Sequence, residues 1–124
     1  MKPLKRPRLR PVVQPLPQLV GPPEPPSRLH GDLWAGNHLT DRAGWPVLID
    51  CDAYAGHREV DIGMMLLFGG FGDRVIDAYE EEFPLAPGWR ERVEANQLLP
   101  LLVHCAMLGA SWLPQTDAVL RSLA

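Results

Sequence analysis

Three oxygen-bearing side chains occur at a spacing that suits phosphoryl transfer. Asn37 follows Asp32 by five residues, and Asp50 comes at the end of a short segment that reads as a hairpin. Phosphoryl transfer needs a carboxylate that orients the attacking hydroxyl and accepts its proton, and oxygen ligands that hold Mg²⁺ against the phosphates. Mg²⁺ takes few protein oxygens and keeps several waters. The pattern therefore predicts a phosphotransferase site that uses Mg²⁺.

A β-hairpin is predicted between Asn37 and Asp50. The stretches HLT (38–40) and PVLID (46–50) read as strands, and DRAGW between them supplies the turn. Gly44 can take the positive φ that such a turn needs, and a proline suits the start of a strand. Strands rise about 3.3 Å per residue, so two short strands that fold back on each other place the first and last residues side by side.

The remainder of the globular part is predicted to be mainly helical. The segment RLH (28–30) reads as a brief strand that enters the loop at Gly31. Apolar residues at helical spacing predict a buried helix, which two glycines end, and then an amphipathic helix that a proline closes. The predicted helices cover 59–68, 73–83, 89–108 with a kink at Pro100, and 116–123. A hairpin followed by helices belongs to the α+β class.

Asp61 lies inside a predicted helix that is otherwise apolar nearly all round. A charged group in such surroundings is strongly unfavourable unless it is paired or hydrogen-bonded. We therefore expect it to have partners, either backbone N–H groups of the loop that carries Asp32 or the side chain of Arg58.

Size and composition favour a single domain preceded by a proline-rich segment. The chain has 124 residues, and nine of its 14 prolines come before Arg28. The net charge of −3 divides into +4 for residues 1–27 and −7 for residues 28–124. We expect 1–27 to be a basic linker and 28–124 to be the catalytic part. The stretch KPLKRPRLR has no interleaved aromatic residue and is broken by prolines, which favours a solvated tail over a nucleic-acid contact.

Nothing in the sequence indicates a membrane partner or export. No apolar run reaches 18 residues, and no apolar region follows the basic N-terminus as it would in a secretory signal. Cys51 and Cys105 lie far apart and outside any metal-ligand spacing. A disulfide between them stays open, although two free thiols in a cytoplasmic protein are favoured.

The amino-acid sequences of these motifs resemble those of the fructosamine (ketosamine) kinase family. The segments HGDLWAGN and GHREVDIGMM are specific to this family, and PLAPGWRERVEANQLLPLLVH also resembles it. The resemblance covers residues 16–123. It implies the protein-kinase-like fold shared with aminoglycoside phosphotransferases. It also implies ATP and Mg²⁺ as cofactors and a glycated amine as substrate, either a small molecule or a glycated protein, as in deglycation repair.

Carried over to this chain, the resemblance assigns roles to five residues. Asp32 matches the catalytic base, and Asn37 and Asp50 match the Mg²⁺-binding positions. His30 matches the buried histidine that braces the catalytic loop. Asp61 matches the acidic residue that orients this loop.

Three further residues have weaker assignments. Trp34 is expected either to stack on a sugar acceptor or to pack the loop onto the core. His57 and Arg58 are expected either to line the acceptor or phosphate side or to form surface salt bridges. The chain also departs from the family pattern just after Asp50, with Cys51 in place of a proline and Asp52 in place of a small residue.

The family resemblance further implies a two-lobed enzyme, of which this chain looks like a C-terminal-lobe fragment. No glycine-rich loop precedes Arg28, and Lys2 and Lys5 lie in the proline-rich segment rather than in a strand. We therefore expect weak binding of Mg-ATP and an inactive or weak enzyme. Apolar surface that the missing helices of the larger lobe would cover favours self-association or a partner.

Three alternatives remain beside the ketosamine kinase. One is another small-molecule kinase of the aminoglycoside phosphotransferase type, and the second is a non-catalytic pseudo-kinase fragment. The third is a metallohydrolase. Its ligands would come from His30, Asp32, Asp50, Asp52 and His57.

Overall fold

The fold is given by a computed structural model, which describes residue 12 and residues 15–124. It has mixed α+β architecture, as predicted. Its elements are α2 (Leu16–Leu19), β1 (Ser27–Leu29), η1 (Ala35–Asn37), β2 (His38–Thr40), β3 (Pro46–Leu48), β4 (Tyr54–Gly56), α3 (Glu59–Phe68), α4 (Asp73–Glu82), η2 (Trp89–Arg92), α5 (Val93–Leu108), η3 (Ala110–Trp112) and α6 (Leu113–Ser122).

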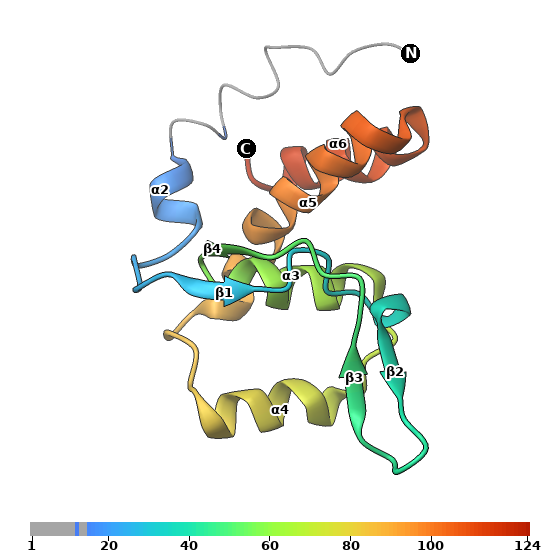
Figure 1. Cartoon of the computed structure of the whole chain (residues 1–124). Coiled ribbons are helices and arrows are strands. Elements are labelled where there is room, and N and C mark those ends of the chain that lie inside the picture. The colour runs from blue at the N-terminus through green and yellow to red at the C-terminus, as the bar shows by residue number, and fades with distance from the viewer. Residues whose placement is uncertain (1–11, 13–14) are drawn as a thin grey trace.

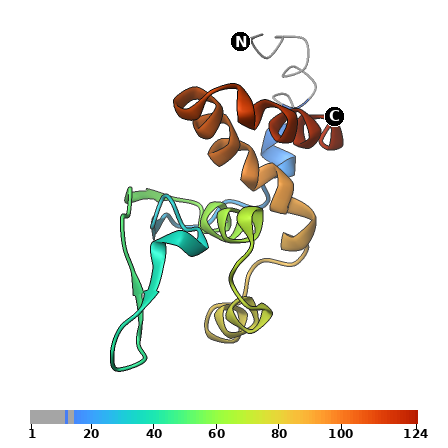
Figure 2. The same cartoon turned by 90° about the vertical axis from the view of Figure 1, so that its right-hand side faces the viewer.

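The predicted hairpin is present as the antiparallel pair β2–β3, with His38 opposite Leu48 and Thr40 opposite Pro46. Asp41 forms its turn, because one carboxylate oxygen accepts hydrogen bonds from the backbone N–H groups of Ala43 and Trp45. In both views the hairpin extends away from α5 and α6 (Figure 1 and Figure 2).

A second two-stranded sheet pairs β1 with β4, with Ser27 opposite Gly56 and Leu29 opposite Tyr54. The strand predicted at 28–30 is therefore present one residue earlier. The sequence did not predict β4. Its three residues, Tyr-Ala-Gly, carry little strand signal, and a strand this short forms because the chain returns beside β1.

Helix α3 lies between α4 and α5 in both views (Figure 1 and Figure 2). Its buried residues Ile62 and Met65 pack with Ile76 of α4 and with Leu85 and Trp89. The opposite side approaches α5 closely at Gly63, whose carbonyl accepts a hydrogen bond from Gln97. The prediction of a buried helix here is confirmed, and α3 is the element on which the site is built.

The long C-terminal helix begins later than predicted, because residues 89–92 form the 3-10 turn η2 before α5. Helix α5 then continues through Pro100 to Leu108. Helix α6 starts at Leu113 rather than at 116, and Pro114 lies in its first turn, where a proline is readily accommodated. Among the described residues, no helix has the length and apolarity needed to cross a membrane.

Part of the predicted linker packs against the folded lobe. Val12 is 1% exposed and lies in a core cluster with residues of α5 and α6, against which Leu16 and Leu19 of α2 also pack. The cluster comprises Val12, Leu98, Leu101, Val119 and Leu120. The pattern of prolines did not predict these contacts, and the basic stretch at residues 2–10 lies outside the described residues.

Candidate active site

Asp61 fixes the loop that carries Asp32. One carboxylate oxygen accepts the backbone N–H of His30 at 2.7 Å, and the other accepts that of Gly31 at 3.2 Å. Of the two partners predicted for Asp61, the backbone N–H groups are present. Hydrogen bonds to an ionised carboxylate are roughly twice as strong as neutral ones. The first turn of α3 therefore holds the start of the loop at two adjacent peptide groups.

His30 joins this loop to the end of the hairpin. Its Nδ1 accepts the backbone N–H of Asp32 at 3.2 Å, so in the neutral ring the proton is on Nε2. Nε2 lies 2.8 Å from the carbonyl oxygen of Ile49 and donates to it. The imidazole is half-buried rather than fully buried as expected. It connects Asp32 to the residue before Asp50.

Asn37 orients the carboxylate of Asp32. Its Nδ2 donates to the backbone carbonyl of Asp32 at 2.9 Å and to Oδ2 of the same residue at 3.1 Å. Asn37 is only 6% exposed, and its backbone carbonyl accepts the N–H of Ile49 at 2.9 Å. Both side-chain bonds use the amide nitrogen, which leaves Oδ1 of Asn37 as the atom that can serve as an oxygen ligand.

Asp50 has a left-handed backbone conformation with φ 53°, and it is the only non-glycine residue in the described part of the chain with positive φ. This conformation costs roughly 1–2 kcal/mol in most residues, although aspartate tolerates it better than others. This change in backbone direction ends the β2–β3 pairing, so β3 stops at Leu48 and not at residue 50 as predicted. The chain then turns back, so that the N–H of Asp52 donates to the carbonyl of His30 at 2.8 Å.

Gly31 is required by the same close approach. Its φ is +86°, and a Cβ at this position would lie 2.0 Å from the backbone oxygen of Asp52. Only glycine permits this contact without movement of one of the two loops. The segment after Asp50, where the chain departs from the family pattern, therefore packs directly on the loop that carries Asp32.

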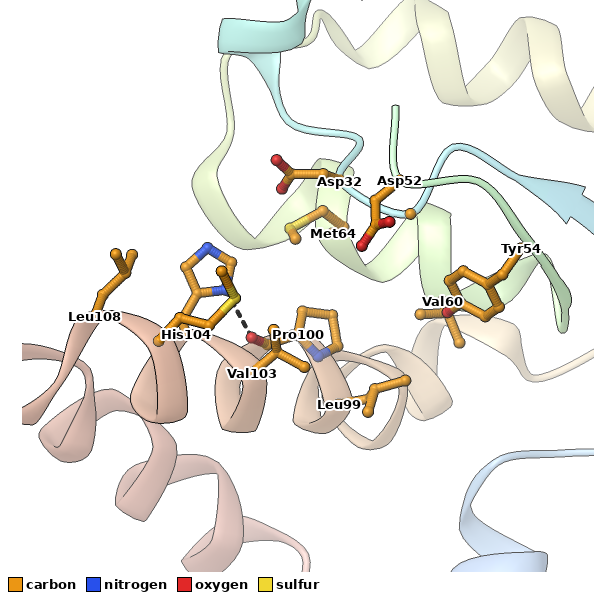
Figure 3. A pocket seen from close by; sticks show the side chains of 12 residues that line it. Asp32, Asp52, Tyr54, Val60, Met64, Leu99, Pro100, Val103, His104 and Leu108 are labelled. Atoms are coloured by element: carbon orange, nitrogen blue, oxygen red, sulfur yellow. Dashed lines mark hydrogen bonds between the residues drawn. The ribbon is translucent and has the colours of Figure 1, made fainter. Parts of the chain in front are cut away.

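A pocket of about 280 Å³ opens beside Asp32. Figure 3 shows Asp32 and Asp52 on one wall and side chains of α5, including Val103 and His104, on the facing wall. Val60 and Met64 of α3 and Tyr54 of β4 also line it. Burial, followed by the negative charges of Asp61 and Asp52, raises the pKa of Tyr54. The pocket thus combines the predicted base with a largely apolar space.

The oxygen donors near Asp32 suit Mg²⁺ better than a transition metal. Asn37 and Asp50 offer an amide and a carboxylate oxygen, the hard ligands that Mg²⁺ takes together with water and phosphate oxygens. In the described part of the chain, no group of three or more His, Cys, Asp or Glu side chains could hold a metal ion. The residues named for the metallohydrolase alternative therefore do not form such a group.

Trp34 and His57 lie outside the lining of this pocket. Trp34 is 41% exposed and meets Phe68 edge-on with 6.0 Å between ring centroids, so it touches α3 while part of its surface stays accessible. His57 accepts the N–H of Glu59 on Nδ1 and lies 3.1 Å from the carbonyl of Pro22 through Nε2. This histidine therefore links the start of α3 to the segment before β1.

Arg58 is an internal anchor rather than a substrate-facing or surface group. It is 5% exposed and forms a bidentate pair with Glu24, at 2.8 and 3.1 Å. It also donates to the carbonyls of Phe83 and Pro84 at 2.8 and 2.7 Å. The hydrogen bond to Glu24 raises the pKa of Arg58. The expectation that it lines the acceptor side is corrected by these contacts, which occupy its donors within the fold.

His104 and Tyr54 line the pocket, and the sequence did not single them out as site residues. His104 is half-buried, and its Nδ1 donates to the carbonyl of Pro100 at 2.7 Å. Its position one helical turn after Pro100, on the α5 side that carries Val103, is the signal that could have placed it. Tyr54 could be placed only once β4 was known.

The family model and the curated relatives that match this chain point to the same family. The family model described as fructosamine kinase matches residues 4–124. The "Probable ketoamine kinase" of Lactiplantibacillus plantarum is 46% identical over 95 residues, which cover 77% of this chain and 34% of the relative. The ketosamine-3-kinase of Mus musculus is 33% identical over 99 residues, which cover 80% and 32%. The chain thus spans about a third of the length of the curated relatives it matches.

Solved structures agree with the sequence comparison. The chain matches the "putative fructosamine-3-kinase" of Thermobifida fusca YX-ER1 with a TM-score of 0.87 at 45% identity, covering 97% of this chain and 43% of that one. A second match, from Haemophilus somnus 129PT, has a TM-score of 0.79 at 28% identity and covers 93% and 40%. The expected kinase-like partial lobe is therefore confirmed, and the chain belongs to the fructosamine kinase family.

Proposed function

We propose that this chain carries the proton-accepting and metal-binding side of an ATP-dependent ketoamine kinase. The reaction moves the γ-phosphate of ATP to a sugar hydroxyl of a glycated amine, either a small molecule or a glycated protein. The observation that carries the proposal is the contact between Asn37 and Asp32 at the edge of the pocket, at 3.1 Å. This contact supports the proposal, because it brings together a carboxylate and a side-chain amide, the two groups that phosphoryl transfer uses as base and metal ligand.

Asp32 accepts the proton of the sugar hydroxyl as its oxygen attacks the γ-phosphorus and the bond to the β-phosphate oxygen breaks. Because Nδ2 of Asn37 donates to Oδ2 of Asp32, the other carboxylate oxygen is left to receive that proton. Asp61 contributes through the loop backbone and holds the base in place before substrate arrives.

Asn37 and Asp50 are the residues that would hold Mg²⁺. When bound, the ion supplies positive charge that neutralises the phosphate oxygens. The protein contribution is positional, since Asn37 is fixed by three hydrogen bonds through its side chain and carbonyl. The strained backbone of Asp50 fixes the direction from which its carboxylate leaves the hairpin.

Nucleotide binding by the described residues alone is proposed to be weak. Both lysines of the chain, Lys2 and Lys5, lie outside the described residues, so the described lobe supplies no lysine to the phosphates.

Several large apolar side chains are accessible to solvent. Among them, Trp45 on the hairpin is 70% exposed and Met107 on α5 is 77% exposed. Self-association through such surface is a further proposal.

A cytoplasmic location is proposed from cysteine chemistry. Cys51 is free and exposed, and Cys105 is free and buried, where its sulfur contacts the hydroxyl of Thr116 at 3.1 Å. An exposed free thiol next to the predicted metal ligand Asp50 persists best in a reducing compartment.

The test is release of ADP from ATP in the presence of Mg²⁺ and a fructosamine, compared between the wild type and Asp32→Asn. Release that requires the fructosamine and is lost in the variant supports the proposal. Release with an aminoglycoside but not a fructosamine would favour the other small-molecule kinase. A folded wild type with no release, and no Mg-ATP binding by calorimetry, would favour the pseudo-kinase fragment.

A further inference from the structure

The pocket beside Asp32 has two chemically different walls. Asp32 and Asp52 lie on one side, and a stripe of α5 lies on the other (Figure 3). Leu99, Val103 and Met107 of this stripe recur every four residues on one helical face and are 52%, 44% and 77% exposed. A molecule that fills the pocket therefore meets carboxylates at one end and hydrocarbon at the other.

Asp52 has a fixed backbone and an accessible side chain. Its N–H donates to the carbonyl of His30 at 2.8 Å, and its own carbonyl lies against Gly31. The residue is nevertheless exposed, and its carboxylate points into the cavity in Figure 3. The position of this charge relative to Asp32 is thus set by the two loops, while the carboxylate can still meet a ligand.

The charge at this end of the pocket favours a cationic group over an anionic one. Among the described residues that line the pocket there is no lysine or arginine. A cleft lined by charges of one sign concentrates ligands of the opposite sign. A second carboxylate beside the base would repel a phosphate group, so Asp52 is poorly suited to the nucleotide and well suited to the acceptor.

We propose that Asp52 is a specificity-determining residue that binds the protonated secondary amine of the ketoamine, while Leu99, Val103 and Met107 receive the hydrocarbon part of that amine. The inference rests on the proposed ketoamine kinase function and narrows its substrate. In a ketoamine, the amine and the sugar hydroxyls are a few bonds apart, so one small molecule can reach both carboxylates. The preferred acceptors are sugar adducts of hydrocarbon amines that lack a carboxylate of their own.

The main test uses calorimetry at low salt with two matched probes. One probe is the 1-deoxyfructosyl adduct of isopentylamine, and the other is the ether in which oxygen replaces its nitrogen. They are titrated into the wild type, Asp52→Asn and Asp77→Asn. Asp77 is an exposed residue of α4 outside the pocket lining, so its variant controls for the loss of one negative charge.

We expect Asp52→Asn to weaken binding of the amine probe by about tenfold or more, the range for a charge-assisted hydrogen bond. Binding of the ether should not change in this variant, and Asp77→Asn should bind both probes like the wild type. A further variant, Val103→Thr, and a third probe, the 1-deoxyfructosyl adduct of methylamine, test the apolar wall. Val103→Thr should weaken binding of the isopentyl adduct several-fold more than binding of the methylamine adduct. Circular dichroism checks that each variant is folded.

Three results would overturn the inference. These are equal affinity of the wild type and Asp52→Asn for the amine probe, equal affinity of the wild type for amine and ether, or no measurable binding of the amine probe by folded wild type. Failure of the kinase proposal looks different. In that case Asp52-dependent binding persists, but no ADP is released and Asp32→Asn changes nothing.

Discussion

The side-chain amide of Asn37 donates to both the backbone carbonyl and the carboxylate of Asp32, so the two residues form a closed unit within one loop. The carbonyl of Asn37 also accepts the N–H of Ile49 and thereby connects this unit to the hairpin. The unit thus couples the geometry of the predicted base to that of the predicted metal ligands.

Substitution of Asn37 should have a larger effect on turnover than on the stability of the fold. We expect Asn37→Ala to lower fructosamine-dependent ADP release by roughly 100-fold, because the base loses its orienting donor and the site loses one ligand. Asn37→Asp keeps an oxygen ligand but places a second carboxylate beside Asp32. If Asn37 acts as a ligand, raising Mg²⁺ should partly restore Asn37→Asp but not Asn37→Ala, and equal responses would contradict that role.

Loss of the Asp61 carboxylate should loosen the loop that carries Asp32 locally. In Asp61→Ala the N–H groups of His30 and Gly31 lose their acceptors, at a cost of about 1–3 kcal/mol in the free energy of unfolding measured with urea. Hydrogen exchange measured by NMR should accelerate most at these two amides. Uniform acceleration across α3 and α5 would instead indicate a general loss of stability.

A matched pair of glycine variants separates backbone strain from crowding. Gly31 and Gly44 have φ of +86° and +87°, but a Cβ at Gly44 has nothing within 4 Å. We expect Gly44→Ala to lower the free energy of unfolding by roughly 1–2 kcal/mol, because its positive φ alone is unfavourable for alanine. Gly31→Ala should cost about 1–3 kcal/mol more, because its Cβ would meet the backbone of Asp52. Similar unfolding free energies for the two variants would show that the loops separate easily.

The ion pair between Glu24 and Arg58 should make stability depend on pH. The hydrogen bond from Arg58 holds the pKa of Glu24 below its ordinary value of 4.5. A carboxylate with a lowered folded pKa contributes stability above the unfolded pKa, and this contribution disappears as pH falls through the folded pKa. The unfolding free energy of the wild type should therefore fall below about pH 4.5, and that of Glu24→Gln should fall less.

At pH 7 we expect Glu24→Gln to destabilise by about 1–3 kcal/mol, since Arg58 is buried and Glu24 is only 20% exposed. Arg74→Gln is the control, because its pair with Glu81 is exposed and should contribute less than about 1 kcal/mol. Equal effects of the two variants would show that burial adds nothing to the Glu24 pair.

Local chemistry made the hairpin and the helices predictable. The turn glycine, the apolar spacing and the proline and glycine boundaries each act within a few residues, and the pairing of His38 with Leu48 follows from them. Asp61 was also predictable, because a carboxylate in an otherwise apolar helix must find donors. In each case the deciding interaction lies close in sequence or is required by apolar surroundings.

The missed features depend on contacts between distant segments. Strand β4 exists because residues 54–56 return to β1, and Val12 is buried because it meets α5 and α6. Arg58 resembles a surface cation in the sequence, but its partner Glu24 lies 34 residues away. Propensity and spacing do not carry such information, so the pocket walls could be assembled only from the folded chain.

The beginning of α3 binds three separate parts of the molecule through neighbouring residues. Arg58 holds the segment before β1, Glu59 holds Arg92 just ahead of α5 at 2.6 Å, and Asp61 holds the loop that carries Asp32. One residue inserted here would rotate everything after it by about 100° around the helix axis. The length of this turn is therefore fixed by geometry, whereas the tip of the hairpin, which is exposed, can accept insertions during evolution.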